Sequence, residues 1–250
     1  MRRPTTALFI PVHNEHETIG KVIEHILKVA GDRIGLLVVA DDASTDGSDR
    51  IAARYTEHVV RLAHNGGNGC ATRAALTYIK AHDDGIERVV RIDGDGQHEP
   101  DLLPEVIDRL EAGADVVVCS RFHPRSDTRH VPFDRKFLNE SAAGWMRTVT
   151  DWPVTDARSG FLGFRWNVLR PVVDALRTER YGIPMELLLR VWHRDPSACL
   201  SEIPHPAMYQ PGISERLDRK YVEETVSEKT ARMDEAFRVF IATCRDLGIL

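Results

Sequence analysis

The chain has 250 residues, of which 42% are hydrophobic and 28% are charged, which is ordinary for one globular α/β domain with a sizeable core. The formal net charge of −5 argues against a nucleic-acid-binding protein, because backbone phosphates demand a basic face. The four cysteines share no C-x-x-C spacing, which argues against a zinc site or a disulfide framework and fits a reducing cytosol.

The beginning of the chain shows no signal-peptide pattern, since Met1-Arg2-Arg3-Pro4 leads directly into a short strand pattern. No apolar run approaches the ~18 residues that a membrane helix requires. We therefore expect a soluble, cytoplasmic protein without a transmembrane segment, with attachment to a membrane surface left open.

The first half of the chain alternates strand and helix patterns. Strands are predicted over 7–12, 35–40, 59–62, 88–92 and 115–120, with helices over 18–29, 72–82 and 102–112. Strands of nearly continuous Val, Ile and Leu that alternate with helices predict a parallel sheet covered on both faces.

The second half is less regular. A polar segment over 123–135 predicts a loop, helices are expected over 137–148 and 185–193, and strands over 161–165 and 201–204, the last of these at a sheet edge. Residues 222–247 predict a long amphipathic helix, whose apolar stripe is expected to dock on the core, with an oligomer interface as the alternative.

Polar clusters follow four of the predicted strands. They are Asn14-Glu15, Asp41-Asp42, Asp93-x-Asp95 and Arg121. Ligands of parallel sheets bind beyond the carboxyl ends of the strands, so we expect these clusters to converge on one rim.

The strongest local pattern is Arg91-Ile92-Asp93-Gly94-Asp95-Gly96-Gln97-His98. Two carboxylates two residues apart, just past a strand and with glycines around them, can approach a cation that bridges two phosphates. Oxygen ligands of this kind suit Mg²⁺ or Mn²⁺, and such a metal neutralises charge on a departing nucleotide diphosphate. Carboxylate pairs are also common in solvated turns, but the preceding strand and the neighbouring loops favour the functional interpretation.

Two further segments have a functional and a structural interpretation. Asp41-Asp42 can accept hydrogen bonds from a nucleotide base or ribose, whereas helix capping explains Asp46 and Ser48. The glycine-rich segment 64–69 either presents backbone N–H groups to an anion or forms a tight turn. It is not a G-x-G-x-x-G pattern after the first strand, so a dinucleotide-binding fold is poorly supported.

These motifs, in this order, resemble those of glycosyltransferase family 2, and most closely its polyprenyl-phosphate mannose or glucose synthase branch. The resemblance rests on Ile10-Pro11-Val12-His13-Asn14-Glu15, Asp41-Asp42-x-Ser44-x-Asp46-Gly47, the segment 65–75 and Asp93-Gly94-Asp95-Gly96-Gln97-His98. It continues through Gly113 to Arg121, through Asp156-x-x-Ser159-Gly160-Phe161, which resembles Asp-x-Thr-Ser-Gly-Phe, and through Tyr181 to Leu188.

The resemblance implies a GT-A fold, that is, a Rossmann-like, mostly parallel sheet flanked by helices. It also implies a nucleotide-sugar donor, a divalent metal (Mn²⁺ or Mg²⁺) and, since family 2 enzymes are typically inverting, a single in-line displacement at the anomeric carbon. We expect one domain over 1–250, with a nucleotide-sugar-binding half over 1–121, an acceptor-side half over 122–221 and a C-terminal helix over 222–250.

The resemblance also assigns roles to residues. It implies Asp95 as a metal ligand with Asp93 beside it and Gln97 next to the metal, and it places Asp42, with Asp41, near the base or ribose. Arg121 is implied as a contact of the diphosphate or of an acceptor phosphate. The expected nucleotide-sugar site comprises Pro11, Val12, Asn14, Glu15, Asp41, Asp42, Asn68, Asp93, Gly94 and Asp95.

The acceptor is left open. The branch usually carries an Arg-x-x-Gly-x-Ser-Lys-like stretch near its end, whereas residues 208–216 here read Met-Tyr-Gln-Pro-Gly-Ile-Ser-Glu-Arg. This departure slightly favours a small hydroxyl-bearing acceptor, such as a natural-product intermediate, over a polyprenyl phosphate. A hydroxyl needs a general base, for which Asp156 and Glu186 are the candidates, although either can instead structure its loop through backbone hydrogen bonds.

Other classes fit less well. A nucleotidyltransferase would usually begin with a glycine-rich loop and a Lys or Arg, which residues 8–20 lack. A phosphohydrolase of the Asp-x-Asp type would need its nucleophile after the first strand, where this chain has Pro-Val-His-Asn-Glu. A non-catalytic nucleotide-binding module stays as the non-enzymatic alternative. The base and sugar of the donor and the oligomeric state, including a homodimer, are open.

Overall fold

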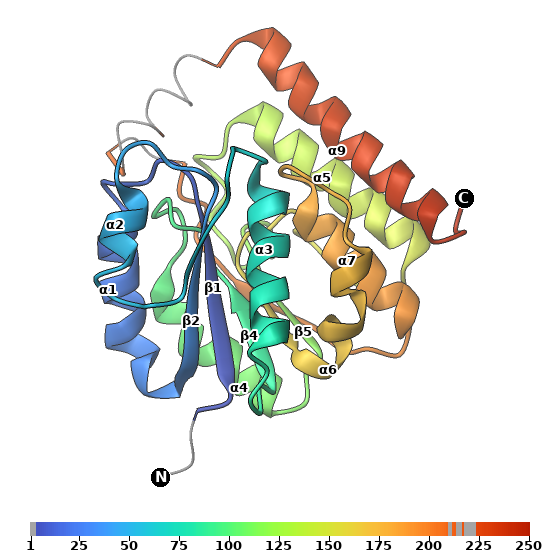
Figure 1. The fold of residues 1–250 in the computed structure, drawn as a ribbon. Coiled ribbons are helices and arrows are strands. Elements are labelled where there is room, and N and C mark those ends of the chain that lie inside the picture. The colour runs from blue at the N-terminus through green and yellow to red at the C-terminus, as the bar shows by residue number, and fades with distance from the viewer. Residues whose placement is uncertain (1–3, 210–211, 214–216, 218–223) are drawn as a thin grey trace.

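The structure is a computed structural model that describes residues 4–209, 212–213, 217 and 224–250. Its described residues form one seven-stranded sheet in the order β3-β2-β1-β4-β6-β5-β7 (Figure 1). The strands are β1 Thr6–Val12, β2 Ile34–Asp41, β3 Val59–Arg61, β4 Arg88–Arg91, β5 Val116–Ser120, β6 Leu162–Arg165 and β7 Leu200–Pro204.

The sheet is mostly parallel, as predicted. The exception is β6, which lies between β4 and β5 and runs antiparallel to both. The predicted edge strand is β7, which pairs in parallel with β5 at the end of the sheet.

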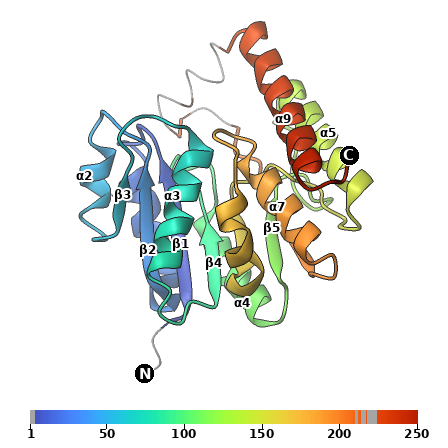
Figure 2. The ribbon, with the colours of Figure 1, turned by 45° about the vertical axis from the view of Figure 1, so that its right-hand side comes forward.

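Helices cover both faces of the sheet, because successive side chains of each central strand point to opposite sides. In β1, Leu8 and Ile10 pack with α1 (Ile19–Ala30) and α4 (Leu103–Glu111). Ala7 and Phe9 pack instead with α3 (Asn68–Ala81) and α7 (Ile183–Arg194), which lie on the other face (Figure 2). Every residue of β1 is buried, which explains its nearly continuous apolar sequence.

The remaining helices are α2 Ser48–Ala52, α5 Phe133–Val149, α6 Trp166–Leu169 and α9 Val226–Asp246, with short 3₁₀ turns at Gly31–Arg33, Pro100–Leu102 and Arg170–Ala175. Helix α5 begins inside the segment 123–135 that was predicted as a loop. Its first turn after Pro132 is rich in charged residues, so the apolar period that marks a helix is absent there.

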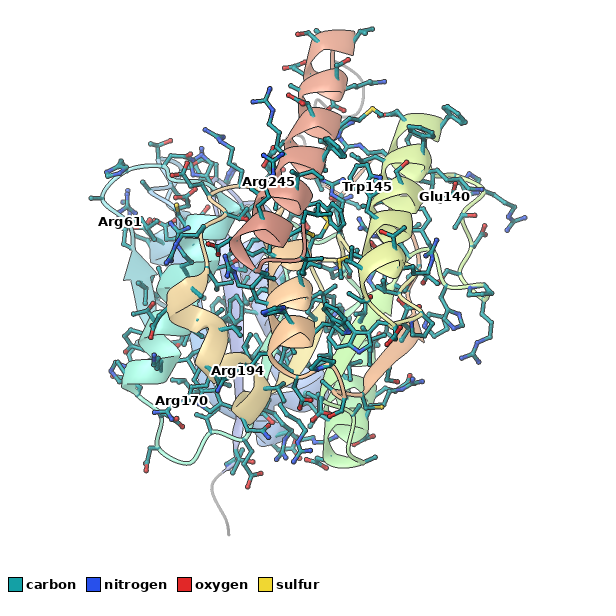
Figure 3. The ribbon with its side chains drawn as sticks, turned by 90° about the vertical axis from the view of Figure 1, so that its right-hand side faces the viewer. Arg61, Glu140, Trp145, Arg170, Arg194 and Arg245 are labelled. Carbon is teal, nitrogen blue, oxygen red and sulfur yellow. The ribbon has the colours of Figure 1, made fainter. Side chains whose placement is uncertain are left out.

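Helix α9 lies beside α5, as Figures 1 and 2 both show. Trp145 of α5, labelled in Figure 3, contacts Phe237 and Phe240 of α9, with ring centroids 5.3 and 5.9 Å apart. The docking predicted for this helix is therefore confirmed. The helix begins at Val226 after a capping box made by Thr225 and Glu228. Of the predicted start, residues 222–223 lie outside the described residues.

In the part of the chain that the structure describes, no helix combines the length and the apolar character needed to cross a bilayer.

Candidate functional site

A cavity of about 650 Å³ opens where β1, β2 and β4 end, at the upper edge of the sheet in Figure 1. This is a usual size for a small-molecule site. The predicted residues that line it are Pro11, Val12, Glu15, Asp42, Asn68, Asp93, Gly94, Asp95, Gln97 and Arg121. The expected convergence on one rim is therefore observed, whereas Asn14, Asp41, Asp156 and Glu186 do not line the cavity.

The loop after β1 is tied to the loop after β2. The backbone N–H groups of Asn14 and Glu15 donate to Ser44 Oγ (2.9 Å) and Ser48 Oγ (2.8 Å). Asn14 Oδ1 accepts from Thr45 N (2.8 Å), and Asn14 adopts a φ of 55°, a left-handed conformation that asparagine tolerates well. Asn14 thus braces two loops that carry cavity residues.

The two aspartates after β2 have different surroundings. Asp41 is fully buried, where it accepts from Arg61 Nη1 (3.0 Å) and from the N–H of Ser44. Asp42 faces the cavity, and its two carboxylate oxygens accept from the N–H groups of Gly66 and Gly67 (2.7 Å each). The structure therefore places Asp42, but not Asp41, within reach of a ligand.

The same contacts favour the tight-turn interpretation of the glycine-rich segment. Two of its N–H groups are used by Asp42, and those of Gly69 and Cys70 donate to Glu179 O (2.7 and 3.1 Å). Gly67 has a φ of 93°, and a Cβ there would lie 2.7 Å from Glu179 O, so only glycine fits.

Asp93 is held by two cationic or polar side chains. Arg91 Nη2 donates to Asp93 Oδ1 (2.7 Å), and His98 Nε2 lies 3.2 Å from Oδ2. Burial alone would raise the pKa of the Asp93 carboxyl, but Arg91 and His98 outweigh it and hold that pKa well below its usual range. Asp93 is therefore ionised at neutral pH.

The oxygen atoms near Asp93 fit a hard divalent cation. Asp95 and Gln97 line the same cavity, and Asp95 Oδ1 accepts from Gln97 N (3.0 Å). Gln97 Nε2 donates to Met208 O (2.8 Å), so the atom that Gln97 offers a cation is its amide oxygen. Carboxylate and amide oxygens are the donors that Mg²⁺ and Mn²⁺ prefer. A separate group, His25, Glu99 and Asp101, has closely spaced ligand atoms but does not line the cavity.

Arg121 lines the cavity and is fixed by Asp156. Its Nε and Nη2 donate to the Asp156 carboxylate (2.7 and 2.9 Å), and Nη1 donates to Tyr209 Oη (3.1 Å). Burial would raise the pKa of Asp156, but the Arg121 guanidinium lowers it overall. A buried carboxylate engaged in this way is a weak proton acceptor, so it positions Arg121 instead.

Glu186 also binds groups of the protein and does not line the cavity. Its carboxylate is 1% exposed and accepts from the N–H groups of Arg177 (2.9 Å) and Thr178 (2.7 Å) and from Arg190 Nε (2.8 Å). For both base candidates the geometry thus matches the alternative in which the carboxylate structures a loop.

Several cavity residues were missed from the sequence. The clearest signal was Arg158, which stands where the Asp-x-Thr-Ser-Gly-Phe motif has threonine. Arg135 and Asn139 on α5 also line the cavity, as do Glu224, Arg232 and Glu235 near or on α9. These positions come together only when α5 and α9 dock, so no local pattern marks them.

Comparisons with known proteins bear on the resemblance. A polyprenol monophosphomannose synthase of Mycolicibacterium smegmatis is 29% identical over 201 residues, which are 75% of this chain and 73% of that protein. An undecaprenyl-phosphate mannosyltransferase of Micrococcus luteus is 30% identical over 191 residues, 72% of this chain and 75% of that protein.

Among solved structures, glucosyl-3-phosphoglycerate synthase of Mycobacterium tuberculosis, in complex with Mn²⁺ and UDP-glucose, matches with a TM-score of 0.72 at 18% identity. The match covers 96% of this chain and 79% of that chain, and it confirms the GT-A fold. The model of the family described as glycosyl transferase family 2 matches residues 7–172. The chain therefore belongs to glycosyltransferase family 2.

Proposed function

We propose that the protein transfers a sugar from a nucleotide-diphosphate sugar to a phosphate monoester, with a polyprenyl phosphate as the acceptor. The observation that carries this proposal is the composition of the acceptor side of the cavity. Three arginines, Arg121, Arg135 and Arg158, line it, while both predicted bases are buried in contacts with the protein. A phosphate acceptor is already ionised and needs no base, which suits this arrangement.

The donor occupies the side of the cavity formed by the β1, β2 and β4 loops. Asp42 and Asn68 contact the base and ribose, and Asp93 with Asp95 lies toward the diphosphate. The glycine loop holds both oxygens of Asp42, so its direction is fixed before a ligand arrives. This assignment follows the family motifs onto the positions that line the cavity.

When bound, a divalent cation, Mn²⁺ or Mg²⁺, would neutralise the charge that builds on the departing nucleotide diphosphate. Asp95 and Gln97 are the residues that would hold it. Asp93 keeps its negative charge beside them because Arg91 compensates it.

In the reaction, Arg121 and Arg135 orient the acceptor phosphate behind the anomeric carbon. A phosphate oxygen forms the new C–O bond as the bond to the nucleotide diphosphate breaks, so the configuration inverts. The guanidinium of Arg121 presents its fork in a fixed direction because Asp156 holds it, which lowers the entropic cost of binding an anion.

Two aromatic side chains support a lipid on that phosphate. Phe133 and Phe137 are 82% and 49% exposed, and their rings stack with centroids 6.3 Å apart on α5. They lie one helical turn apart, around Arg135, which lines the cavity. A polyprenyl tail leaving the cavity beside Arg135 has an apolar surface to follow. Attachment of the protein to a membrane surface belongs to the same proposal.

The names of the two curated relatives add support, since both describe enzymes of polyprenyl phosphates. They favour this acceptor over the small hydroxyl-bearing molecule that the sequence slightly favoured. The experiments below also test the two alternatives, a hydroxyl-bearing acceptor and a non-catalytic nucleotide-binding module.

The first experiment is thermal melting with UDP, GDP, dTDP and CDP, each with and without Mn²⁺ or Mg²⁺. A ligand at ~100 times its Kd adds about 2.7 kcal/mol, or roughly 5–10 °C for a chain of this size. We expect one diphosphate to stabilise the wild-type protein only with metal, and Asp95→Ala to abolish the effect. Asp101→Ala is the control, since it removes a carboxylate of the group outside the cavity.

The second experiment incubates the matching nucleotide sugar with farnesyl phosphate, farnesol and glycerol, and measures sugar transfer by mass spectrometry. Transfer to farnesyl phosphate alone supports the proposal. Transfer to an alcohol in its place would restore the hydroxyl acceptor, and no binding of any diphosphate in the first experiment would leave the non-catalytic module.

A further inference from the structure

Arg158 lines the cavity, and its side chain forms no ion pair within the part of the chain that the structure describes. Arg91, Arg121 and Arg135 are paired with Asp93, Asp156 and Glu224, respectively, at 2.7 to 3.0 Å. No carboxylate of the described part of the chain lies within ion-pair distance of the Arg158 guanidinium. Its Nε is shut off from solvent and has no hydrogen-bond partner among the described residues.

This arrangement is unfavourable for the protein without a ligand. Burial, together with the charges of Arg121 and Arg135, lowers the pKa of Arg158 to about 10, so the group is still a cation at neutral pH. Arg158 is partly buried, and a partly buried cation without an ion-pair partner costs stability.

The fold makes little use of the Arg158 side chain. The hydrogen bond of this residue within the described chain comes from its backbone N–H, which donates to Asp156 Oδ1 (3.3 Å). A second unsatisfied group lines the same cavity: Asn139 Oδ1 is buried without a donor, while Asn139 Nδ2 donates to Arg135 O (2.7 Å). The unpaired cation is complementary to an anionic group, and Asn139 Oδ1 can accept a hydrogen bond from a hydroxyl elsewhere on a ligand.

We infer that Arg158 binds the phosphate monoester of the acceptor and determines the preference of the enzyme for phosphorylated acceptors. The inference rests on the proposed function and adds a residue to it. Arg121 and Arg135 are already partly neutralised by carboxylates, so Arg158 supplies the positive charge that a doubly charged phosphate requires. The phosphate can belong to a lipid headgroup or to a small soluble molecule.

The test compares wild type, Arg158→Met, Arg158→Lys and Arg194→Met. Arg194 is exposed at the end of α7 (Figure 3), so its replacement removes one charge away from the cavity. Each protein is titrated by thermal shift with farnesyl phosphate in detergent, with glycerol phosphate, and with farnesol as the uncharged control. Titrations with nucleotide diphosphate and metal test the donor side separately.

We expect Arg158→Met to weaken phosphate binding on the order of 10- to 100-fold, because a hydrogen-bonded charge is lost. The phosphate affinity of Arg158→Lys should lie between those of wild type and Arg158→Met. Arg194→Met should bind phosphate as wild type does. Without ligand, Arg158→Met should melt higher by roughly 2–4 °C, since it removes an uncompensated, partly buried charge. If Arg158→Met loses affinity for farnesyl phosphate, the phosphate belongs to a lipid headgroup. If it loses affinity for glycerol phosphate alone, the phosphate belongs to a soluble molecule.

Wild-type affinity of Arg158→Met for both phosphates would overturn the inference. A lower melting temperature of both Arg158 variants without ligand, with unchanged phosphate affinity, would assign the side chain a structural role instead. The two proposals fail separately. Arg158-dependent phosphate binding without sugar transfer refutes only the proposed function, whereas transfer to farnesyl phosphate with an unchanged KM in Arg158→Met refutes only this inference.

Discussion

The carboxylate of Asp156 receives three hydrogen bonds from the single residue Arg121, from Nε at 2.7 Å, Nη2 at 2.9 Å and the backbone N–H at 3.1 Å. Asp156 is completely buried, while Arg121 reaches the cavity wall. The carboxylate therefore fixes both the backbone and the guanidinium of a residue that lines the cavity, without lining the cavity itself.

Replacing Asp156 with asparagine should destabilise the protein by about 3 kcal/mol, because a buried ion pair loses one partner. Urea unfolding at pH 7 measures the change. The control is Asp127→Asn, which breaks the exposed pair with Arg129 and should leave the midpoint unchanged. A variant of wild-type stability that has lost transfer at every pH would show that Asp156 is a base after all.

Glu186→Gln tests whether the other candidate base is also a structural carboxylate. It should lower the free energy of unfolding by about 2–3 kcal/mol, since the buried Arg190 loses a charged partner and the 177–178 backbone loses an acceptor. Below its melting temperature, the variant should keep most of its kcat. A fall of roughly 10²–10⁴-fold, as loss of a general base produces, would contradict the structural role.

His205 should make the protein sensitive to acid. Burial, together with the nearby His98 and Arg121, lowers the pKa of His205 to about 3, and its Nε2 accepts from Glu99 N (3.1 Å). In the unfolded chain the pKa of a histidine is near 6.5. Below that pH the unfolded chain therefore binds a proton at His205, whereas the folded protein does not. Stability is thus complete above about pH 6.5 and declines as the pH falls toward 3, by on the order of 1.4 kcal/mol per pH unit.

His205→Gln keeps an acceptor for Glu99 but cannot titrate in this range. Chemical unfolding between pH 7 and 4 should show a shallower loss of stability for this variant than for wild type. His64→Gln, at an exposed histidine, is the control and should follow the wild-type curve. Parallel curves for wild type and His205→Gln would rule out the assignment.

Docking of α9 should depend on Phe240 more than on Phe237. Phe240 is 5% exposed and contacts Trp145, whereas Phe237 is 48% exposed. Truncation of a buried phenylalanine typically costs about 3–5 kcal/mol, so Phe240→Ala should lower the melting temperature far more than Phe237→Ala does. Equal effects of the two changes would mean that the outer face of α9 is also covered in solution, as in a dimer.

The parts of the fold that local patterns encode were predictable. The central strands, their helices and the polar turns that follow them carry their signals within a few residues, and Asp42, Asp93 and Asp95 do line one cavity. The direction of β6 was not predictable, because an antiparallel strand has the same local sequence pattern as a parallel one.

The roles of Asp156 and Glu186 were harder to predict for a related reason. Whether a carboxylate serves chemistry or the backbone depends on which groups lie opposite it after folding. The partners of Glu186 include Arg177, nine residues earlier in the chain, and Asp156 is paired with Arg121, 35 residues away. The sequence shows that Arg158 departs from the motif, but only the three-dimensional structure shows that its guanidinium lacks an ion pair within the described residues.

One wall of the cavity includes residues from the last part of the described chain. Glu224, Glu228, Arg232 and Glu235 all line the cavity, although the family match ends at residue 172. During synthesis on the ribosome, β1, β2, β4 and the loops that follow them emerge long before this last helix does. A nascent chain can therefore assemble that part of the cavity first, and the remaining wall closes only when α9 has been released.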